Sequence, residues 1–325
     1  MLAIVAPGQG AQVPGFLSPW LELPGLAEQF AAWSEVVGLD LVRYGTTADA
    51  EEIRDTAVAQ PLLVGAGMAA ASAILGPLSS PSPALPAERS HVDVVAGHSV
   101  GEFTAAAVAG VLTPKDALAL VAERGRGMAE AAARTETGMT AVLGGDREQV
   151  LQALAAAGLT PANDNGSGQI VAAGTVEQLA AFAENPPARA RLRPLSVAGA
   201  FHTEHMAPAV ERVRAAAASL SPSDPVVRIL SNADGAVVDS GARYLERLVS
   251  QVSSPVRWDA CTQTLADLGV TALVELTPAG TLTGLARRAL RGVELLAVKT
   301  PDDIDRATAL VKEHAGTPAG TVQEG

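Results

Sequence analysis

Residues 92–101 read Val-Asp-Val-Val-Ala-Gly-His-Ser-Val-Gly, a short apolar run that ends in a serine between two glycines. The apolar run predicts a strand, and the alanine-rich stretch 102–111 predicts a helix after it. A serine in so sharp a strand-to-helix turn needs glycine two residues away on either side, because larger neighbours would clash. The turn would lift the hydroxyl clear of the sheet and aim backbone N–H groups at the group that the serine attacks. Ser99 is therefore a candidate nucleophile, and the alternative is an ordinary serine that caps the helix.

The composition predicts a large core built mainly from small aliphatic side chains. Of the 325 residues, 48% are hydrophobic and only 3% are aromatic, which favours many closely packed helices. The chain is longer than one typical domain. One large domain with an insertion and two domains in tandem both fit this length.

Composition also argues against several classes of protein. The formal net charge is -12 and no long basic run is present, which argues against a nucleic-acid partner. Cys261 is the only cysteine, so disulfides within the chain and cysteine-built zinc sites are excluded and a reducing cytoplasm fits. The first residues lack the basic region of a secretory signal, and the apolar stretch Leu62–Leu75 is shorter than the roughly 20 residues of a membrane span. We expect a cytoplasmic protein without a membrane anchor, in which this stretch is a core helix.

Short runs of Val, Ile and Leu alternate with longer helical patterns, which is typical of an α/β domain with a largely parallel sheet. The proline-rich residues 76–90 predict a surface loop. The predicted strands are Leu2–Ala6, Val92–Ala96, Val226–Leu230, Ala272–Leu276 and Glu294–Val298. The predicted helices are Ala48–Asp55, Val58–Leu75, Pro114–Ala132, His205–Leu220, Ala242–Val252, Trp258–Leu268 and Asp302–His314.

A different order of elements occupies residues 138–198. The patterns predict strand 139–143, helix 147–157, strands 160–163 and 169–173, helix 175–184 and strand 192–197. The order βαββαβ is that of ferredoxin-like folds. We therefore predict a large α/β-hydrolase-like domain, residues 1–134 and 200–325, interrupted by a small ferredoxin-like subdomain, residues 135–199. The active-site cleft is expected between them, because ligand sites favour domain junctions.

A serine nucleophile needs a base within hydrogen-bonding reach. Of the five histidines, His202 follows the last predicted strand of the insertion, where the chain re-enters the large domain, and so it faces the predicted cleft. The nearby His205 fits the first turn of a helix, and by base rate either histidine can be structural. No acid between Ser99 and His202 stands at an obvious strand end. A Ser-His dyad oriented by a backbone carbonyl is therefore favoured over a triad.

The loop 7–12, Pro-Gly-Gln-Gly-Ala-Gln, directly follows the first predicted strand. It lacks the third glycine of a dinucleotide-binding loop and the Lys-Ser/Thr pair of a P-loop, so nucleotide binding is disfavoured. Its glycines allow close approach of two backbones. The N–H group of Gln9 is therefore a candidate donor to a reacting oxyanion.

Seven separate motifs together resemble those of one known family, the malonyl-CoA:acyl carrier protein transacylases of fatty acid synthesis, with the related acyltransferase domains of polyketide synthases. The resemblance covers essentially the whole chain. The motifs are Pro7-Gly8-Gln9-Gly10, Gly97-His98-Ser99-Val100-Gly101-Glu102, Glu123-Arg124-Gly125, residues 163–169, Gly199-Ala200-Phe201-His202, Pro255-Val256-Arg257-Trp258 and Pro278-Ala279-Gly280.

The resemblance implies a role for each matching residue. Ser99 would be the acylated nucleophile and His202 its base. The N–H groups of Gln9 and Val100 would form the oxyanion hole. Arg124 would hold the malonyl carboxylate through a bidentate guanidinium pair. Without the Glu-Arg-Gly match, Arg124 would be interpreted as a solvated arginine on a helix.

Further positions follow from the same resemblance. Gln251 matches the residue whose main-chain carbonyl orients the histidine, which agrees with the missing acid. Asn163 and Asn165 match positions that line the cleft from the small subdomain, although both could instead stabilise a tight turn with Gly166. Phe201 matches the members that take malonyl units, because a bulky ring fills the room that an extra methyl group needs.

The chain departs from the family pattern in two places. Ser254 stands where asparagine is common before Pro-Val, and Pro278-Ala279-Gly280 replaces a frequent Pro-Gly-Gly or Pro-Gly-Lys. Neither departure involves a residue to which the resemblance assigns chemistry.

The implied activity is transfer of a malonyl group from malonyl-CoA to the phosphopantetheine thiol of acyl carrier protein through a malonyl-serine intermediate. It would supply extender units for fatty acid or polyketide synthesis, with no metal or redox cofactor, and the resemblance implies a monomer. The alternatives are a serine hydrolase or thioesterase, a discrete polyketide acyltransferase with another acyl preference, and a non-catalytic carrier-binding scaffold. Because the carrier is typically acidic, local basic residues are candidates for its docking site, although arginine pairs on helices are usually only solvated faces: Arg189, Arg191, Arg193, Arg287, Arg288 and Arg291.

Overall fold

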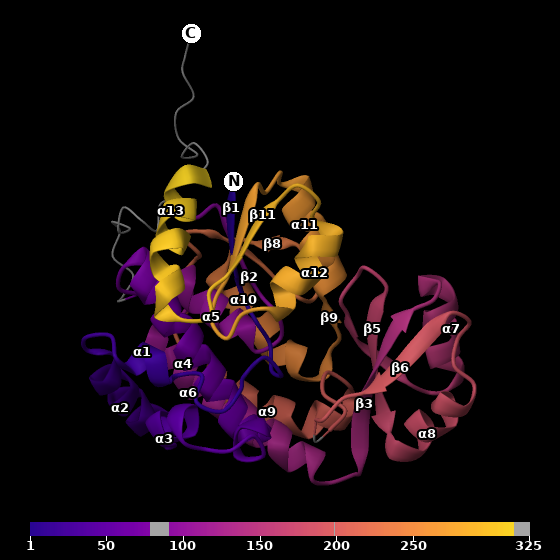
Figure 1. The fold of residues 1–325 in the computed structure, drawn as a ribbon. Coiled ribbons are helices and arrows are strands. Elements are labelled where there is room, and N and C mark those ends of the chain that lie inside the picture. The colour runs from indigo at the N-terminus through magenta and orange to yellow at the C-terminus, as the bar shows by residue number, and fades with distance from the viewer. Residues whose placement is uncertain (79–90, 198, 315–325) are drawn as a thin grey trace.

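The computed structural model describes residues 1–78, 91–197 and 199–314. Figure 1 shows a larger sheet surrounded by helices and a smaller sheet beside it. The predicted mixed α/β fold is confirmed. Most of the predicted proline-rich loop, residues 79–90, lies outside the described residues.

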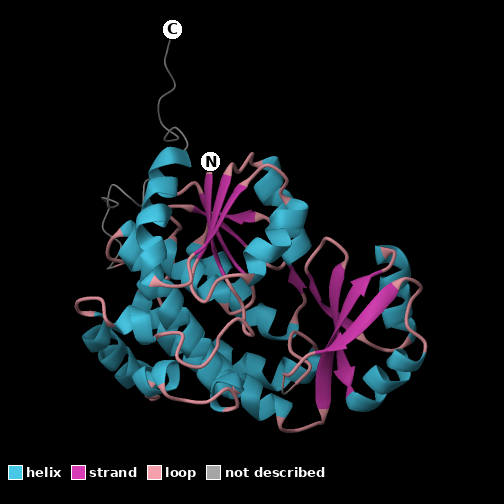
Figure 2. Cartoon of the chain, viewed as in Figure 1, coloured by secondary structure: helices cyan, strands magenta, loops and turns pink. Residues whose placement is uncertain are grey.

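The larger sheet contains all five strands predicted from the apolar runs. These five strands pair in parallel with their neighbours, and only the sixth strand of the sheet, which was not predicted, is antiparallel to its neighbour. Helices cover both faces of this sheet (Figure 2), which explains why its strands lack polar alternation. The strand order is β11 (Glu294–Ala297), β10 (Ala272–Glu275), β1 (Leu2–Ala6), β2 (Val94–Gly97), β7 (Arg228–Leu230) and β8 (Val237–Val238).

Most predicted helices form close to their expected bounds. They are α4 (Thr56–Leu75), α5 (Gly101–Val108), α6 (Pro114–Ala132), α9 (Ala207–Ala217), α10 (Gly241–Ser250), α11 (Trp258–Asp267) and α13 (Ile304–His314). Short 3-10 turns extend three of them: η3 (Glu204–Met206), η4 (Gln251–Ser253) and η5 (Pro301–Asp303). The patterns missed α1 (Ser18–Leu21), α2 (Leu26–Val37), α3 (Leu41–Thr46) and α12 (Thr281–Ala289).

The helix predicted over Ala48–Asp55 was wrong, because only the 3-10 turn η1 (Glu52–Arg54) forms there. Two aspartates explain the difference. The Asp49 carboxylate accepts the N–H groups of Glu51 and Glu52. The Asp55 carboxylate accepts the N–H group of Ala57 and so begins a new helix, α4. These local side-chain bonds replace the backbone bonds of a continuous helix.

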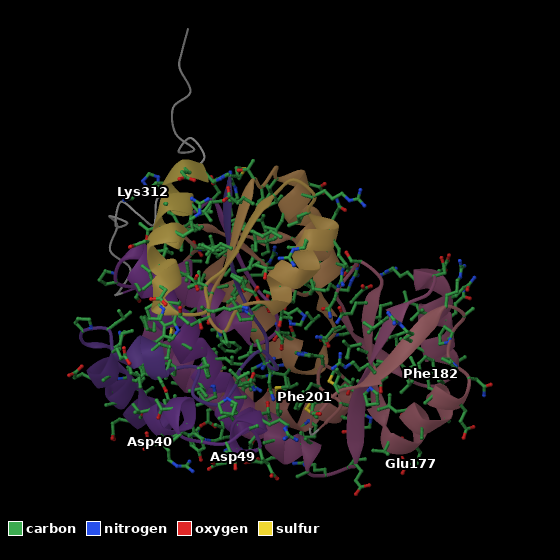
Figure 3. The ribbon with its side chains drawn as sticks, viewed as in Figure 1. Asp40, Asp49, Glu177, Phe182, Phe201 and Lys312 are labelled. Atoms are coloured by element: carbon green, nitrogen blue, oxygen red, sulfur yellow. The ribbon has the colours of Figure 1, made fainter. Side chains whose placement is uncertain are left out.

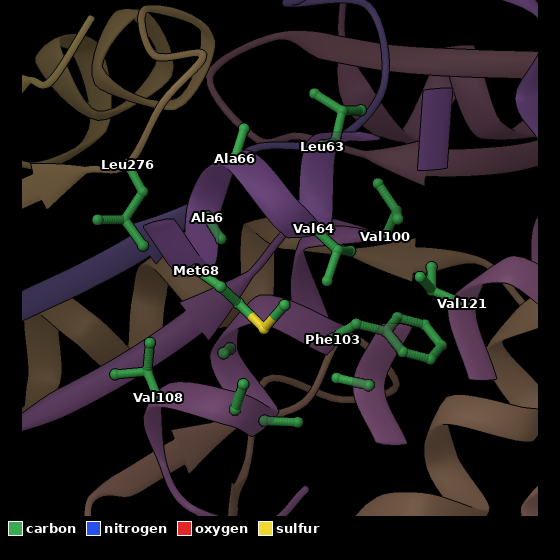
Figure 4. Packing of buried hydrophobic residues seen from close by; sticks show 14 of the residues in the cluster. Ala6, Leu63, Val64, Ala66, Met68, Val100, Phe103, Val108, Val121 and Leu276 are labelled. Carbon is green, nitrogen blue, oxygen red and sulfur yellow. The ribbon is translucent and has the colours of Figure 1, made fainter. Parts of the chain in front are cut away.

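Helix α4 is the centre of the larger core and packs directly behind the serine turn. Figure 4 shows Val64 and Met68 of α4 near Val100 and Phe103. A β-carbon at Gly67 would lie 3.0 Å from two side-chain atoms of Thr104 on α5, so glycine permits this close packing. By length and hydropathy alone α4 could cross a membrane, yet 89% of the tested stretch is buried inside the protein. This burial agrees with the prediction of a core helix.

The smaller sheet has helices on one face only (Figure 2). Side chains alternate along its strands, so Val142 packs under the helices with Phe182, whereas Met139 on the same strand belongs to the larger core. Phe201, which lies outside the strands, also belongs to the larger core. Figure 3 shows Phe182 and Phe201 in these two places. The helices are α7 (Arg147–Ala156) and α8 (Val176–Glu184). The strand order is β6 (Ala190–Pro194), β3 (Thr137–Gly144), β5 (Gln169–Thr175), β4 (Thr160–Asp164) and β9 (Val256–Arg257).

Two features of the smaller sheet differ from the prediction. Its strand β6 ends at Pro194 rather than Val197, and residues 195–197 line a cavity instead. Strand β9, from a distant part of the chain, pairs in parallel with β4 through Asn163 and Val256. A two-residue strand carries no periodic signal, and its pairing depends on packing between segments far apart in the chain.

Candidate active site

The serine turn has the strained geometry that its glycines predict. Ser99 has a φ of 53°, which is unfavourable for a residue with a side chain. A β-carbon at Gly97 would lie 2.0 Å from the carbonyl carbon of Gly101, and one at Gly101 would lie 2.2 Å from the Ala6 carbonyl oxygen. Glycine is therefore required at both positions.

Ser99 and His202 meet although 103 residues separate them in the chain. The Ser99 Oγ lies 2.7 Å from the His202 Nε2. The His202 Nδ1 lies 2.9 Å from the Gln251 carbonyl oxygen, which can only accept, so Nδ1 carries the proton and Nε2 is free to accept one from the serine. Like Ser99, His202 has a positive φ, of 62°.

The electrostatic surroundings keep His202 neutral. Its side chain is buried, and burial together with the nearby Arg124 charge lowers the pKa of His202 to about 3. A neutral imidazole that already accepts a hydrogen bond from the serine is the form that a general base requires.

The N–H groups of Gln9 and Val100 are both available to an incoming ligand. Within the described residues neither of them has a hydrogen-bond partner. The Gln9 side chain is fixed, because it donates to the Arg54 carbonyl and accepts from the Thr56 hydroxyl. The Gly8 backbone packs against His98 of the serine turn, where a β-carbon would lie 2.9 Å from the ring.

Arg124 is 1% exposed, so its interpretation from helical pattern alone as a solvated residue was wrong. Its Nη1 donates to Gln60 Oε1 at 2.6 Å, and its Nη2 donates to Gln251 Oε1 at 2.8 Å and to Ser99 Oγ at 3.2 Å. Its Nε has no partner in the described part of the chain. Burial lowers the pKa of Arg124 to about 10, against the opposing effect of Glu102. The guanidinium therefore stays charged at neutral pH beside the serine.

A cavity of about 540 Å³ opens above Ser99, and both parts of the molecule line it. From the smaller sheet, Asn165 Oδ1 lies 2.9 Å from His98 Nε2, while the buried Asn163 Oδ1 has no partner among the described residues. The tight turn is held instead by Asp164, whose carboxylate accepts the Gly166 N–H group. Phe201 also lines the cavity.

The predicted site residues line one cavity or, like Gln251, contact a residue that lines it, and His98 lines the same cavity, whereas two other histidines lie elsewhere. His314 contacts Thr271 and Glu294 on an exposed face. His205 lies in η3, where its N–H group donates to Thr203. Over residues 1–78, 91–197 and 199–314, no group of three or more His, Cys, Asp or Glu residues is arranged to hold a metal ion.

Sequence reasoning assigned no role to three buried polar residues beneath the site: Gln60, Glu102 and Asn232. Each bonds a residue of the predicted site or its backbone. Burial raises the pKa of Glu102 to about 8, although the Asn232 N–H group and the Arg124 charge oppose this. The sequence marks two of them as unusual without showing their role, because Gln60 interrupts an apolar helix and Asn232 lies two residues past a buried strand.

Comparison with known proteins identifies the family. A family model described as an acyl transferase domain matches residues 5–312. The malonyl CoA-acyl carrier protein transacylase of Mycobacterium tuberculosis strain H37Rv is 54% identical over 311 residues, which cover 95% of this chain and 100% of the relative. The chain belongs to the malonyl-CoA:acyl carrier protein transacylase family. The resemblance inferred from the seven motifs is thus confirmed.

Other members of the transacylase family show the same similarity in sequence and fold. The Escherichia coli K12 malonyl CoA-acyl carrier protein transacylase is 32% identical over 316 residues, with 95% of this chain and 99% of the relative covered. A crystal structure of the Mycobacterium tuberculosis enzyme has a TM-score of 0.88 at 54% identity, with 95% and 99% coverage. A type II polyketide synthase acyl-carrier protein in complex with its malonyl-transacylase contains a chain with a TM-score of 0.84 at 29% identity, with 95% and 99% coverage.

Proposed function

We propose that this transacylase family member transfers malonyl groups from malonyl-CoA to the phosphopantetheine thiol of acyl carrier protein. One observation carries the proposal: the Ser99 hydroxyl contacts a neutral histidine on one side and a buried arginine on the other. The histidine supplies a base, and the arginine supplies a counter-charge for an acyl group that ends in a carboxylate.

In the first half-reaction, Ser99 Oγ attacks the thioester carbonyl of malonyl-CoA while His202 Nε2 takes the serine proton. The oxyanion that develops would accept hydrogen bonds from the N–H groups of Gln9 and Val100. Collapse of the tetrahedral intermediate breaks the carbon–sulfur bond, and His202 returns its proton to the leaving CoA thiolate. The products are CoA and a malonyl ester of Ser99.

In the second half-reaction, the carrier thiol attacks the malonyl ester and gives its proton to His202. The same N–H groups stabilise the second tetrahedral intermediate, and its collapse returns the proton to Ser99 Oγ. The Gln251 carbonyl holds the Nδ1 proton of the imidazole throughout, so it fixes the ring and its tautomer.

Arg124 and Phe201 would select the acyl group. The Arg124 guanidinium would bind the malonyl carboxylate, for which its unpaired Nε is one available donor. Phe201, which is 7% exposed, would fill the space that a methyl branch requires. We infer a preference for malonyl over both acetyl and methylmalonyl groups.

Asn163 and Asn165 would bind the phosphopantetheine arm that both substrates share. The arm contains amide groups, which need donors and acceptors along the cavity. Asn163 Oδ1 is a buried acceptor without a partner in the described residues, and Asn165 is already oriented by His98. Such groups would recognise CoA and carrier substrates equally.

Four of the arginines proposed for carrier docking lie close in the chain to residues that line the cavity. Arg287 and Arg288 are exposed at the end of α12, whose first turns line the cavity. Arg191 and Arg193 are exposed on β6, just before the cavity-lining residues 195–197. Reversing their charge should raise the KM for the carrier and leave acylation by malonyl-CoA unchanged. An unchanged KM would reject this surface.

We also infer the finer architecture. The order β6-β3-β5-β4 supports a ferredoxin-like subdomain over residues 135–199, and the parallel sheet with its serine turn supports a hydrolase-like domain over residues 1–134 and 200–325. The cavity between them would be the active-site cleft. A cytoplasmic monomer that uses only its two substrates is the simplest form of this enzyme.

Mass spectrometry of the protein after incubation with malonyl-CoA tests the proposed function. A malonyl group should appear on the peptide containing Ser99, persist without carrier, and move to holo acyl carrier protein when that is added. Release of free malonate without carrier would instead indicate a hydrolase. Labelling by other acyl-CoAs in preference to malonyl-CoA would indicate a different acyltransferase, and a panel of carriers from fatty acid and polyketide synthesis would place the pathway.

A further inference from the structure

Asn232 lies directly beneath the serine turn and has no part in the chemistry proposed above. Its side chain is fully buried. Its Oδ1 accepts the Ser99 N–H group at 2.7 Å, and its Nδ2 donates to the Gly97 carbonyl at 2.7 Å. One carboxamide therefore holds the backbone on both sides of His98.

The position of Asn232 follows from the sheet. Strands β2 and β7 pair in parallel, but β7 ends at Leu230 while β2 continues to Gly97. A carboxamide offers one donor edge and one acceptor edge, as a peptide group does. The Asn232 side chain thus continues the hydrogen-bond ladder where the β7 backbone has ended, at the point where Ser99 adopts its positive φ.

Glu102 connects the backbone of Asn232 to the side chain of Gln251. It lies in the first turn of α5 and is 1% exposed. One carboxyl oxygen accepts the Asn232 backbone N–H group at 2.7 Å, and the other accepts the Gln251 side-chain amide, so these two donors favour the ionised carboxylate and oppose the effect of burial on its pKa. Gln251 in turn accepts from Arg124 through its side chain and from His202 through its backbone carbonyl.

We propose that Asn232 and Glu102 are positioning residues that hold the Ser99 hydroxyl against His202. Asn232 acts through the backbone of the serine turn, and Glu102 acts through Gln251. Neither side chain lines the cavity. The choice of malonyl-CoA as a probe rests on the proposed function, but the geometry of the dyad does not.

Three substitutions separate positioning from packing. Asn232→Asp keeps the shape but turns an oxygen toward the Gly97 carbonyl, where a donor is needed. Asn232→Ala removes both bonds to the turn. Glu102→Gln keeps the shape but sets an amide donor against either the Asn232 N–H group or the Gln251 amide. In the second case the Gln251 amide keeps only its longer contacts, of 3.4 Å, with the Ser99 carbonyl and Asn232 Oδ1.

The experiment measures two reactions of Ser99 in each variant. One is single-turnover malonylation by malonyl-CoA, with its KM, and the other is modification by a small sulfonyl fluoride, which needs only an activated serine. Both rates should fall about 10²-fold in the two Asn232 variants, because misplacement of a reacting group by about 1 Å has an effect of this size, and both rates should also fall in Glu102→Gln. The KM for malonyl-CoA should stay unchanged in the Asn232 variants. It should rise in Glu102→Gln, where the hydrogen bond between Gln251 and Arg124 is also weakened.

Ser231→Ala is the matched control. Ser231 is the neighbour of Asn232 and is 1% exposed, but its hydroxyl accepts from Ala233 rather than from the serine turn. Urea unfolding of every variant measures the cost in stability. Ser231→Ala should lose stability and keep both Ser99 rates at the wild-type level.

Wild-type rates in folded Asn232→Asp and Glu102→Gln would overturn the proposal, as would losses that follow only the fraction of unfolded protein. If Asn232→Ala does not fold, the two variants of unchanged shape carry the test. Wild-type protein that reacts with the sulfonyl fluoride but not with malonyl-CoA would reject the proposed function. In that case the ratio of sulfonylation rates between variant and wild type still tests the positioning role.

Discussion

The cavity has a floor in the larger part of the molecule and a wall in the smaller sheet, and the two differ in how far their polar groups are already paired. On the floor, Ser99, His202 and Gln251 bond one another or a common neighbour. On the wall, the Asn165 side chain contacts His98, and Asn163 Oδ1 has no partner within the described chain. The reacting groups of the floor are therefore already paired, whereas the wall has an acceptor without a partner among the described residues.

This difference matches two physical requirements. Groups that react must be oriented before substrate arrives, because reorganising them during the reaction costs rate. Groups that recognise a substrate must have hydrogen-bonding capacity left for it. Within the described residues two buried side-chain polar atoms lack a partner, Arg124 Nε on the floor and Asn163 Oδ1 on the wall. One is a charged donor beside the nucleophile, and the other is a neutral acceptor farther out.

The largest effect should come from substituting the reacting pair of the floor, Ser99 and His202. Ser99→Ala should abolish malonylation, and His202→Ala should lower its rate by about 10⁴-fold or more, because the two residues act as a unit. Mass spectrometry of the intact protein after a short incubation with malonyl-CoA measures both. A loss of less than about tenfold in His202→Ala would contradict a dyad.

Removal of the Arg124 charge from the floor should lower malonyl transfer more than acetyl transfer. Arg124→Ala should weaken malonyl transfer by about 2–4 kcal/mol, as when one partner of a buried charge pair is removed, and should affect acetyl transfer less. The comparison of kcat/KM for malonyl-CoA and acetyl-CoA tests this. Arg126→Ala is the control on the same helix, because Arg126 pairs with Glu123 instead. Equal losses for both substrates would remove the selectivity role from Arg124.

Substitutions in the wall should lower activity less than substitutions in the floor. Asn163→Ala should raise the KM for malonyl-CoA by an amount equivalent to about 1 kcal/mol, the contribution of a typical single hydrogen bond, and leave kcat unchanged. Steady-state kinetics at saturating carrier measure both constants. Asn185→Ala, at the C-terminal end of α8, provides an exposed control. A fall in kcat at unchanged KM would show that the wall shares in the chemistry.

The smallest effect concerns pH. Because the pKa of His202 is lowered to about 3, its imidazole stays neutral as the pH falls through 6.5, and the base is not lost. The kcat/KM for acylation by malonyl-CoA should therefore show little change between about pH 7.5 and pH 5. Stopped-flow acylation in buffers of constant ionic strength measures the profile. A tenfold fall per pH unit below 6.5 would show that His202 titrates as an exposed histidine.

Local sequence was sufficient for elements whose geometry depends on neighbours in the chain. The strand β1 and the helix α6 begin and end where the pattern predicts, because an apolar run, a proline and a capping threonine specify them locally. The serine turn is equally local, since two glycines are needed to avoid clashes within a few residues. Ser99 and His202 were identified from their motifs, and the structure brings their side chains together.

Helical pattern and composition by themselves could not show which side of α6 is buried, and so Arg124 was recognised only through its motif. The pairing of β9 with β4 and the contacts of Glu102 and Asn232 gave no local signal of their role. Asn232 bonds Ser99 across 133 residues of chain, and Glu102 bonds Gln251 across 149. The sequence alone determined the strained turn and the residue types that chemistry needs. Only the tertiary structure decided which distant polar groups meet beneath that turn, because burial and pairing depend on how separate segments pack.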